Sequence, residues 1–406
     1  MLSLIFNTNP INIHYASFYN RLTNSLCLDF GSPLKLVNIS EPIIPNDRYV
    51  KLKTRMCGIC GTDLGVLGIR TSFPNTFKKR KGPIFLGHEI VAEVTEVGKA
   101  VSKFKIGDRV TIGDDKNCET FGLESCVFCR DGLPVLCINK HKREYYENIG
   151  AGWSEYFVRH ENQLFAVPDD VDDDTAVLME PVAASLHAVL RSPPGENDNI
   201  LIIGAGTIGL GIVSAIRSLG IESIKITVLG RHEFQRNEAH KLGADHVVNE
   251  ISMYDKLAEI LDTPILGEGG NQILNKGFNY VYDCISSTTS IDNGLRWLSP
   301  RGNLIVVGMS ETPKSIDFTL VARRELNILG THGYAHDSWE NVRQHTIARC
   351  IDWINNGRLK IDSLLTHKFP LSDYKNAFKV ATSHYSANGL KPEPNKTIKV
   401  AFDYAL

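Results

Sequence analysis

Cysteine, histidine and carboxylate residues with the spacing of metal ligands occur in the first half of the chain. Cys60 and His88 lie in the strings MCGICGTD and LGHE, beside glycines that let backbone approach a metal closely. A catalytic zinc takes three protein ligands and leaves one position open for a substrate oxygen. Either Glu89, next to His88, or Glu180, in the string LMEPVAASLHA, could supply the third ligand. These residues predict a catalytic zinc site. Cys57 is interpreted as a packing residue, although CxxC spacing also occurs in redox and zinc-ribbon sites.

Four further cysteines lie close together in the chain, at Cys118, Cys126, Cys129 and Cys137. A CxxC pair followed by another cysteine in one short loop can close a tetrahedral thiolate site with no open position. Such a site stabilises a loop that lacks a core of its own. Cys118 stands further upstream than a compact knuckle would require, and free surface thiols are the alternative. We predict a structural zinc.

A glycine-rich string, ILIIGAGTIGLGIVSAI, places Gly204, Gly206 and Gly209 between an apolar strand and a helix. The glycines permit a tight turn, close approach of a pyrophosphate, and close packing of helix on strand. Thr207 and Ile208 would open the helix, whose free N–H groups and positive dipole end favour phosphates. The string predicts a dinucleotide site. The alternative is a tight turn that binds nothing.

The next strand, ITVL, bears on the choice between the two nicotinamide dinucleotides. It ends in Gly230, Arg231 and His232, and Arg236 follows one helical turn later. An NAD site uses Asp or Glu at this position to accept hydrogen bonds from the ribose 2′-OH, whereas Arg can bind a 2′-phosphate. The string therefore favours NADP over NAD, unless both arginines are merely solvated.

The elements that must position these residues fall into two patterns. Residues 34 to 180 contain short Val- and Ile-rich runs separated by turn residues, as in an all-β module. After Pro181, apolar strands alternate with amphipathic helices, which indicates a parallel sheet covered on both faces. After Gly333 the string ENVRQHTIARCIDWINNG predicts a helix, and a short tail follows that should pack on the first module. We therefore expect one domain at 1–181 with a C-terminal return at 334–406, and a second at 182–333.

Composition excludes several classes of protein. The chain has 406 residues, 43% hydrophobic and 22% charged, which excludes disorder and predicts two or three domains. Its net charge of −2 gives no basic excess, so no nucleic-acid partner is expected. The longest apolar stretch, 200–216, is too short and too rich in glycine to span a bilayer. No export signal is read at the start, and nine cysteines favour a reducing compartment, so a cytoplasmic location is expected.

From about Leu34 onward the sequence resembles the zinc-dependent medium-chain alcohol dehydrogenase family, with its threonine, sorbitol and glucose dehydrogenase branches. The matching strings are GICGTD, GHE with VGKAVSKFKIGDRV, CVFCRDGLPVLC, GWSEY, MEPVAASLHAV, GAGTIG and KLGAD. The resemblance implies an α/β protein with a GroES-like, β-rich catalytic domain and a Rossmann domain built on a doubly wound parallel sheet. It also implies a cleft that holds zinc and nicotinamide.

The resemblance assigns further roles. Thr62 would relay the substrate proton, Asp63 would orient the site, and Glu89 and Glu180 would share ligand and near-zinc roles. The nicotinamide-side contacts would come from Cys284, Val307, Gly308 and Met309. Apart from the resemblance, candidates for the lining of the substrate pocket are loop residues after Leu64, the segment FPNTFKK and Trp153, and the sequence leaves open which of them reach the cleft.

The sequence departs from the family pattern at three places. The spacing before Cys126 is stretched, and Gly65 stands where many relatives carry a proton-relaying His. About 25 residues precede the expected first strand, and no role can be assigned to them.

The expected activity is hydride transfer between an alcohol and NAD(P), with zinc acting as a Lewis acid. The substrate would be a small alcohol or carbonyl compound: a polyol, sugar, amino-alcohol or secondary alcohol. No membrane or nucleic-acid partner is expected, and the family implies a homodimer or homotetramer. One alternative is a zinc-independent, NADPH-dependent double-bond reductase of the same superfamily, which has no need of Cys60 or His88. Another is a non-catalytic NADPH-binding protein, which would bind cofactor tightly without turnover.

Overall fold

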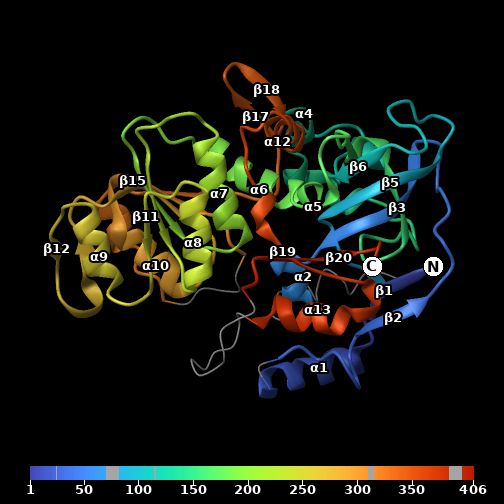
Figure 1. Ribbon diagram of the computed structural model, residues 1–406, viewed down its shortest axis with the longest axis horizontal. Coiled ribbons are helices and arrows are strands. Elements are labelled where there is room, and N and C mark those ends of the chain that lie inside the picture. Colours follow the sequence, from blue (N-terminus) through green and yellow to red (C-terminus); the bar gives the residue numbers. More distant parts are fainter. Residues whose placement is uncertain (24, 70–81, 114–115, 310–314, 384–395) are drawn as a thin grey trace. The chain divides into compact units, whose positions relative to one another are not determined.

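The computed structural model describes residues 1–23, 25–69, 82–113, 116–309, 315–383 and 396–406. These residues form two compact units, Met1–Glu180 with Leu364–Leu406, and Pro181–Ser363 (Figure 1). The sequence predicted 334–363 in the first domain, whereas in the structure they cluster with the second unit. Contacts within that unit explain the difference, since the Ser214 hydroxyl donates to the Lys360 carbonyl at 2.6 Å.

The first unit is built on a seven-stranded sheet, in the order β19-β20-β3-β5-β6-β8, with β7 paired to β3. Its strands are β3 (Tyr49–Gly58), β5 (Ile90–Val97), β6 (Arg109–Ile112), β7 (Tyr156–His160), β8 (Leu164–Ala166), β19 (Leu365–Phe369) and β20 (Lys399–Asp403). Its helices are α1 (Pro10–Thr23), α2 (Gly61–Leu67), α4 (Val127–Arg130), α5 (Asp173–Ala176) and α13 (Tyr374–Ala381). The core collects the apolar side chains of these elements, with Trp153, Phe157, Phe378 and Phe402 fully buried.

A smaller sheet, β2-β1-β4, also belongs to the first unit. Its strands are β1 (Leu2–Phe6), β2 (Leu34–Asn38) and β4 (Ile84–Phe85), and β1 pairs antiparallel with both neighbours. The predicted strands start at about Leu34 and do not include β1, because a five-residue apolar run without flanking turn signals is a weak pattern. Helix α1 is therefore an insertion between two paired strands.

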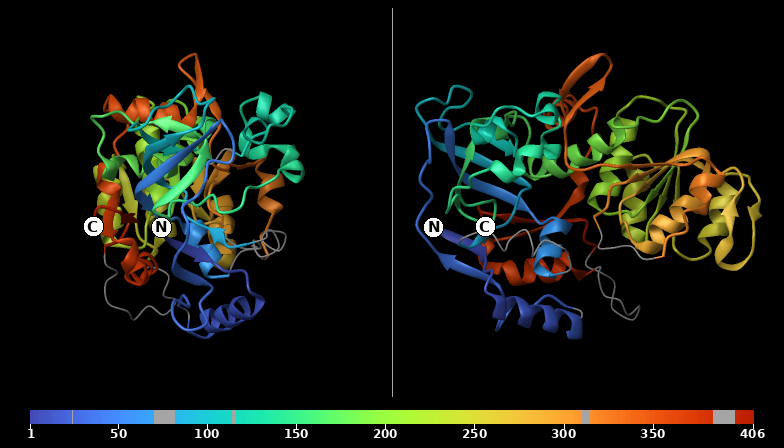
Figure 2. Two further views of the ribbon diagram at one scale, coloured as in Figure 1. Left: turned by 90° about the vertical axis from the view of Figure 1, so that its right-hand side faces the viewer. Right: turned by 180° about the vertical axis from the view of Figure 1, so that it is seen from behind.

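The second unit is a six-stranded parallel sheet in the order β11-β10-β9-β14-β15-β16, with its connecting helices packed on it (Figure 2). Its strands are β9 (Asn199–Ile203), β10 (Lys225–Leu229), β11 (His246–Val248), β14 (Phe278–Asp283), β15 (Leu298–Val306) and β16 (Asn327–Gly330). Its helices are α6 (Met179–Leu190, whose first two residues belong to the first unit), α7 (Thr207–Arg217), α8 (Glu233–Lys241), α9 (Met253–Ile260), α10 (Thr288–Trp297), α11 (Thr319–Arg323) and α12 (Thr346–Asn355). The chain order reverses between β9 and β14, and ligands bind at such a switch point, beyond the carboxyl ends of the strands.

Two small hairpins complete the second unit, one from β12 (Ile265–Leu266) and β13 (Ile273–Leu274), the other from β17 (His336–Trp339) and β18 (Val342–His345). The predicted helix over ENVRQHTIARCIDWINNG was wrong in its first six residues, which form the turn and β18. Glu340 and Asn341 both have positive φ, 49° and 63°, as a two-residue type I′ turn requires. No helix among the described residues is long and apolar enough to cross a membrane.

Candidate functional site

Cys60, His88 and Glu89 come together in the first unit. Their ligand atoms all lie within 4.8 Å of one another. Cys60 follows β3 and caps α2, while His88 and Glu89 immediately precede β5. Strands β3 and β5 pair with Cys57 opposite Ile90, and the Gly58 N–H donates to the Glu89 carbonyl at 2.8 Å. Antiparallel pairing thus joins two strings that are about 28 residues apart in the sequence. Thiolate, imidazole and carboxylate form a donor set that fits zinc.

Asp63 holds two of these residues in place. It is 3% exposed, its Oδ2 accepts the Cys60 backbone N–H at 3.1 Å, and its Oδ1 lies 3.5 Å from His88 Nδ1. Burial disfavours the His88 imidazolium, but the charges of Asp63 and Cys60 outweigh it and raise the pKa of His88 well above its usual value. A carboxylate on the second ring nitrogen is the usual support for a metal-ligating histidine.

Lys399, on β20, is a site residue that sequence analysis missed. Its Nζ lies 2.6 Å and 2.7 Å from the two carboxylate oxygens of Glu89 and 3.3 Å from the Ile59 carbonyl. Glu89 is fully buried and Lys399 is 5% exposed. Burial alone would lower the pKa of Lys399, yet the charges of Glu89 and Cys60 raise it. A lysine about 310 residues from Glu89 in the sequence gives no motif by which it could be found.

The remaining predicted residues of this site lie near it or outside the description. Glu180 stands in the first turn of α6 and its charge also raises the pKa of Lys399, but it is not part of the three-ligand cluster. Thr62 occupies the first turn of α2, half-buried, and Gly65 lies further along the same helix. Trp153 is fully buried against Phe378 and Phe402, so of the candidates for the pocket lining it belongs to the core instead. The segment FPNTFKK falls outside the described residues.

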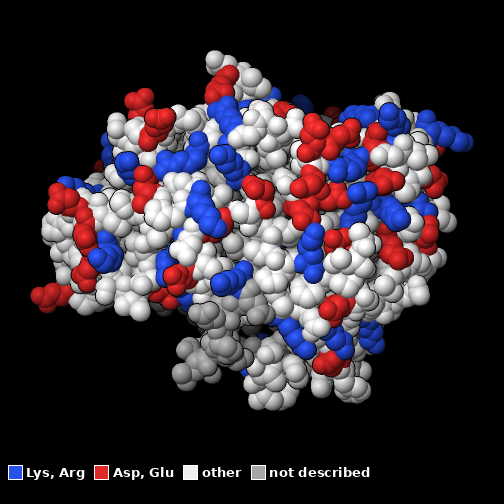
Figure 3. Space-filling view, viewed as in Figure 1, with Lys and Arg blue, Asp and Glu red and all other residues white. Residues whose placement is uncertain are grey.

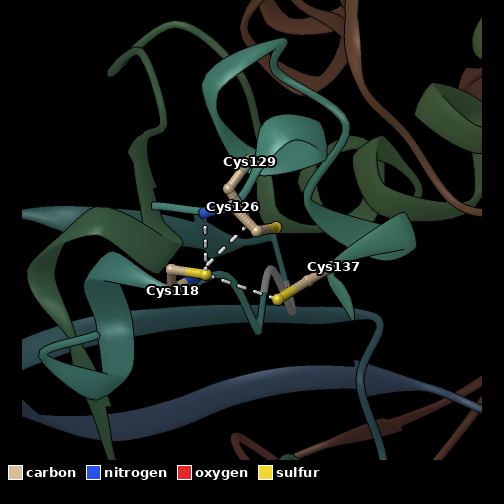
Figure 4. A group of neighbouring side chains, drawn as sticks. All are labelled: Cys118, Cys126, Cys129 and Cys137. Atoms are coloured by element: carbon tan, nitrogen blue, oxygen red, sulfur yellow. Dashed lines mark hydrogen bonds between the residues drawn. The ribbon is translucent and has the colours of Figure 1, made fainter. Parts of the chain in front are cut away.

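The four predicted structural ligands also converge, and their side chains face one another (Figure 4). Their sulfur atoms lie within 4.8 Å of one another. Cys118 Sγ and Cys137 Sγ are 3.6 Å apart, close to the roughly 3.8 Å edge of a tetrahedron with Zn–S bonds of about 2.3 Å. The Cys126 backbone N–H donates to Cys118 Sγ at 3.5 Å. Hydrogen bonding from the Cys129 backbone N–H lowers the pKa of Cys126 to about 6, which favours the metal-binding thiolate.

A short 3₁₀ helix, η1 (Glu119–Phe121), explains how the stretched spacing is accommodated. It follows Cys118 and ends at Gly122 in the left-handed region, with φ 62°. The Leu123 N–H then returns to the Cys118 carbonyl at 2.9 Å, which folds the extra residues back on themselves. Among the residues that the structure describes, the apolar cluster around the thiols contains only Leu123 and Phe128 besides cysteine, so a bound metal fits as the core of this lobe.

The glycine-rich turn lies at the carboxyl end of β9, in the second unit. Gly204 has φ 102°, and a Cβ on Gly209 would lie 1.9 Å from the Gly204 carbonyl oxygen. Gly206 caps α7, whose first residues are Thr207 and Ile208, and a Cβ on Gly206 would meet open space. The turn therefore leaves free space where the helix begins, which fits a pyrophosphate.

The predicted nicotinamide-side loops lie beside this turn. The Cys284 N–H donates to the Ile203 carbonyl at 3.0 Å, and the N–H groups of Val307 and Gly308 donate to the Asp283 carbonyl at 3.0 and 2.9 Å. Met309 follows and is half exposed. Parallel pairing of β9, β14 and β15 thus gathers three loops at one edge of the sheet.

The residues after β10 are already engaged by other groups. Arg236 Nη1 donates to the Gly230 and Arg231 carbonyls at 2.9 and 2.8 Å, and Arg231 Nε lies 3.1 Å from Glu250 Oε1. His232 caps α8, and burial together with the Arg231 charge lowers its pKa. Glu250 was missed by sequence analysis, because it follows β11 rather than β10.

Comparisons with known proteins agree with both units. Residues 46–169 match the family described as alcohol dehydrogenase GroES-like domain, and residues 207–348 match zinc-binding dehydrogenase. The chain is 26% identical to D-arabitol-phosphate dehydrogenase of Enterococcus avium, over 85% of this chain and 90% of that protein. It is 24% identical to sorbitol dehydrogenase of Halalkalibacterium halodurans, over 82% and 88%.

A solved Escherichia coli structure, described as a short chain alcohol dehydrogenase complexed with NADH, has the same fold. Its TM-score is 0.74, at 20% identity over 99% of each chain. The GroES-like and Rossmann-type α/β fold expected from the sequence is thereby confirmed. The chain belongs to the zinc-dependent medium-chain alcohol dehydrogenase family.

Proposed function

We propose that this chain is a zinc-dependent oxidoreductase that transfers hydride between a carbinol carbon of a polyol or polyol phosphate and NAD(P). The observation that carries this is the cluster of Cys60, His88 and Glu89, whose ligand atoms lie within 4.8 Å of one another. A double-bond reductase has no use for these ligands. The substrate class rests on the D-arabitol-phosphate and sorbitol dehydrogenases to which the chain is similar.

When bound, zinc would lower the pKa of the substrate hydroxyl and the nicotinamide would accept the hydride. Cys60, His88 and a carboxylate would hold the metal. Asp63 fixes the first two through its contacts with the Cys60 N–H and His88 Nδ1. Thr62, in the same first turn of α2, would take the proton of the substrate hydroxyl through its own hydroxyl and pass it towards solvent.

Glu89 is our choice for the third ligand, with Glu180 as a nearby second carboxylate. A carboxylate offers about four acceptor positions, and Lys399 uses one on each oxygen of Glu89. The remaining acceptor positions of Glu89 are available to a metal that Cys60 and His88 would also hold. In this arrangement Lys399 compensates the buried charge of Glu89 and positions it.

For the cofactor we propose NADP, with Arg231 as the group that binds the 2′-phosphate. The residues directly after β10, at 230–232, include no carboxylate. The Arg231 guanidinium is nevertheless bound to Glu250, with Arg231 Nε 3.1 Å from Glu250 Oε1. Phosphate would have to displace Glu250, which costs affinity. Glu250→Gln should therefore tighten binding of 2′-phospho-AMP, measured calorimetrically, whereas binding of AMP should not change. Equal affinities of wild type and variant for 2′-phospho-AMP would leave Arg231 without this role.

A metal count and an alcohol panel test the proposal. Mass spectrometry of the intact protein should find two zincs per chain, and absorbance at the nicotinamide band should show oxidation of polyols with NADP and NAD assayed in parallel. Cys60→Ala and His88→Ala should abolish oxidation while dinucleotide binding remains. One zinc per chain together with reduction of activated double bonds would support the reductase instead.

Location and partners complete the proposal. No two of the nine cysteines are joined by a disulfide, and five of them are proposed zinc ligands, an arrangement that suits a reducing compartment. On the face shown in Figure 3, Lys and Arg intermingle with Asp and Glu, and no basic stripe is visible there. We therefore propose a cytoplasmic enzyme whose ligands are small molecules.

A further inference from the structure

Helix α1 presents apolar side chains to solvent. Ile11, Phe18 and Leu22 are 77%, 67% and 74% exposed, and Tyr15 between them is 40% exposed. Phe30 extends this surface, since it is 87% exposed and its ring contacts Tyr15 edge-on at 6.1 Å between centroids. Isolated exposed apolar residues need no explanation, but a continuous row on one helix indicates an interaction surface.

The opposite face of α1 is fixed to the first unit partly by polar contacts. Asn20 is buried, its Nδ2 donates to the Leu67 carbonyl at 3.2 Å, and its Oδ1 accepts the Cys27 N–H at 2.7 Å. Ala16, one turn earlier, is fully buried. The buried positions of α1 thus carry a small residue and an amide, Ile13 on the same side is half-buried, and four large apolar residues point outward. This is the reverse of an ordinary surface helix.

The spacing of the outward residues suits a helix partner. Ile11, Tyr15, Phe18 and Leu22 follow one another at intervals of four, three and four residues, which is the spacing of a two-helix seam. The series reads the same in either direction along the helix. A second α1 running antiparallel would therefore place Ile11 against Leu22 and Tyr15 against Phe18, and a two-fold axis would repeat both contacts.

We propose that α1 pairs antiparallel with α1 of a second copy of this chain, through a two-fold interface made by Ile11, Tyr15, Phe18 and Leu22 and bordered by Phe30. If each of these five side chains loses on the order of 100–150 Å², the pair buries about 1,000–1,500 Å² in total, which reaches the roughly 1,000 Å² that a specific interface requires. The proposal depends on the inserted helix alone and not on the reaction.

The charges around α1 favour a second copy over an anionic membrane. The helix has no acidic residue, and Arg21 is its one basic residue besides His14. Antiparallel pairing sets Arg21 opposite Asn12, so like charges do not meet. The neighbouring Lys375 is already paired with Asp29 at 2.6 Å. In Figure 3 the lowest edge of the surface over α1 is uncharged, and basic and acidic side chains mingle just above it. A membrane-binding helix would instead need a rim that is basic throughout.

Solution mass of the full-length protein tests the pairing. Sedimentation or light scattering should give Phe18→Glu half the mass of the wild type, because two carboxylates would lie at the centre of the seam. Ile106→Glu is the matched control, since Ile106 is 65% exposed on a loop of the same unit and its replacement should leave the mass unchanged. A monomeric wild type, or a Phe18→Glu protein of wild-type mass, would overturn the proposal.

A charge pair tests the antiparallel direction. Ile11→Lys alone should weaken the pairing, and adding Leu22→Glu should restore it, because each Lys then faces a Glu of the other copy. In a parallel pair the same double variant would set Lys against Lys, so failure to restore the wild-type mass refutes the geometry. Flotation with phosphatidylglycerol vesicles that is lost in Phe18→Glu, with unchanged mass, would assign the surface to a membrane instead. Circular dichroism should show that every variant is folded.

Discussion

Replacing Lys399 by Met would test the buried ion pair beside the proposed metal site. Both oxygens of Glu89 contact the Lys399 ammonium, at 2.6 and 2.7 Å, and neither side chain is more than 5% exposed. Removing the ammonium leaves a buried carboxylate without its charge partner. Such a loss costs about 3–5 kcal/mol of unfolding free energy. A surface pair is worth only about 0–1 kcal/mol.

Urea unfolding followed by fluorescence would measure the effect. Lys399→Met should lose about 3–5 kcal/mol, whereas Lys399→Met with Glu89→Gln should regain most of it, because the charge is then absent. Lys368→Met is the matched control, since Lys368 pairs with Asp174 at 2.9 Å on the surface of the same sheet. The loss should be smaller in zinc-loaded protein, where a nearby cation offsets part of the Glu89 charge.

Two results would refute this reasoning. A Lys399→Met protein within about 1 kcal/mol of wild type would mean that the pair behaves like an exposed one. Equal stabilities of the single and double variants would mean that the cost does not come from an uncompensated Glu89.

Three further predictions concern other parts of the chain. Gly209→Ala should abolish binding of NAD(P) in a fluorescence titration, because its Cβ would lie 1.9 Å from the Gly204 carbonyl oxygen; wild-type affinity would contradict the tight turn. Cys126→Ser should reduce the zinc content by one per chain, with faster hydrogen exchange confined to 116–143. An unchanged zinc content would show that Cys126 is not a zinc ligand. Glu161 is buried, which would raise its pKa, but the Ser102 N–H and Arg48 outweigh burial and lower it below 4.5. Its contribution is therefore present above pH 4.5 and lost as pH falls, so Glu161→Gln should destabilise by about 1–3 kcal/mol at pH 7 and progressively less below pH 4.5. A difference from wild type that does not depend on pH would contradict this.

The features that the sequence predicted correctly depend on short-range rules. The glycine-rich turn, each single strand–helix step after Pro181, and the run from Cys118 to Cys137 extend over about twenty residues, so local sterics and ligand geometry determine them. The metal site of Cys60 and His88 was predicted from their residue types beside glycines, and in the structure antiparallel pairing of β3 and β5 brings the two together.

The features that were missed depend on long-range pairing or on position in three dimensions. Lys399 reaches Glu89 only because β20 pairs with β3, which sets Ala401 opposite Gly58. Glu250 faces Arg231 because β11 lies beside β10 in the sheet. The helix expected to begin at Glu340 begins later, because a turn in which two residues have positive φ comes first. Positive φ is hard to predict from the sequence where no glycine is present.

The turn of the β17–β18 hairpin has a strained backbone conformation, and that conformation places a side chain where it anchors the hairpin. Glu340 occupies a left-handed conformation that costs a non-glycine residue about 1–2 kcal/mol. In that position its carboxylate accepts two hydrogen bonds from Arg358, at 2.7 and 3.0 Å, and the guanidinium lies 4.1 Å above the Trp353 ring. A glycine at 340 would relax the backbone and would also remove the carboxylate that binds Arg358. The hairpin would then lose its attachment beyond the end of α12 and would move more freely.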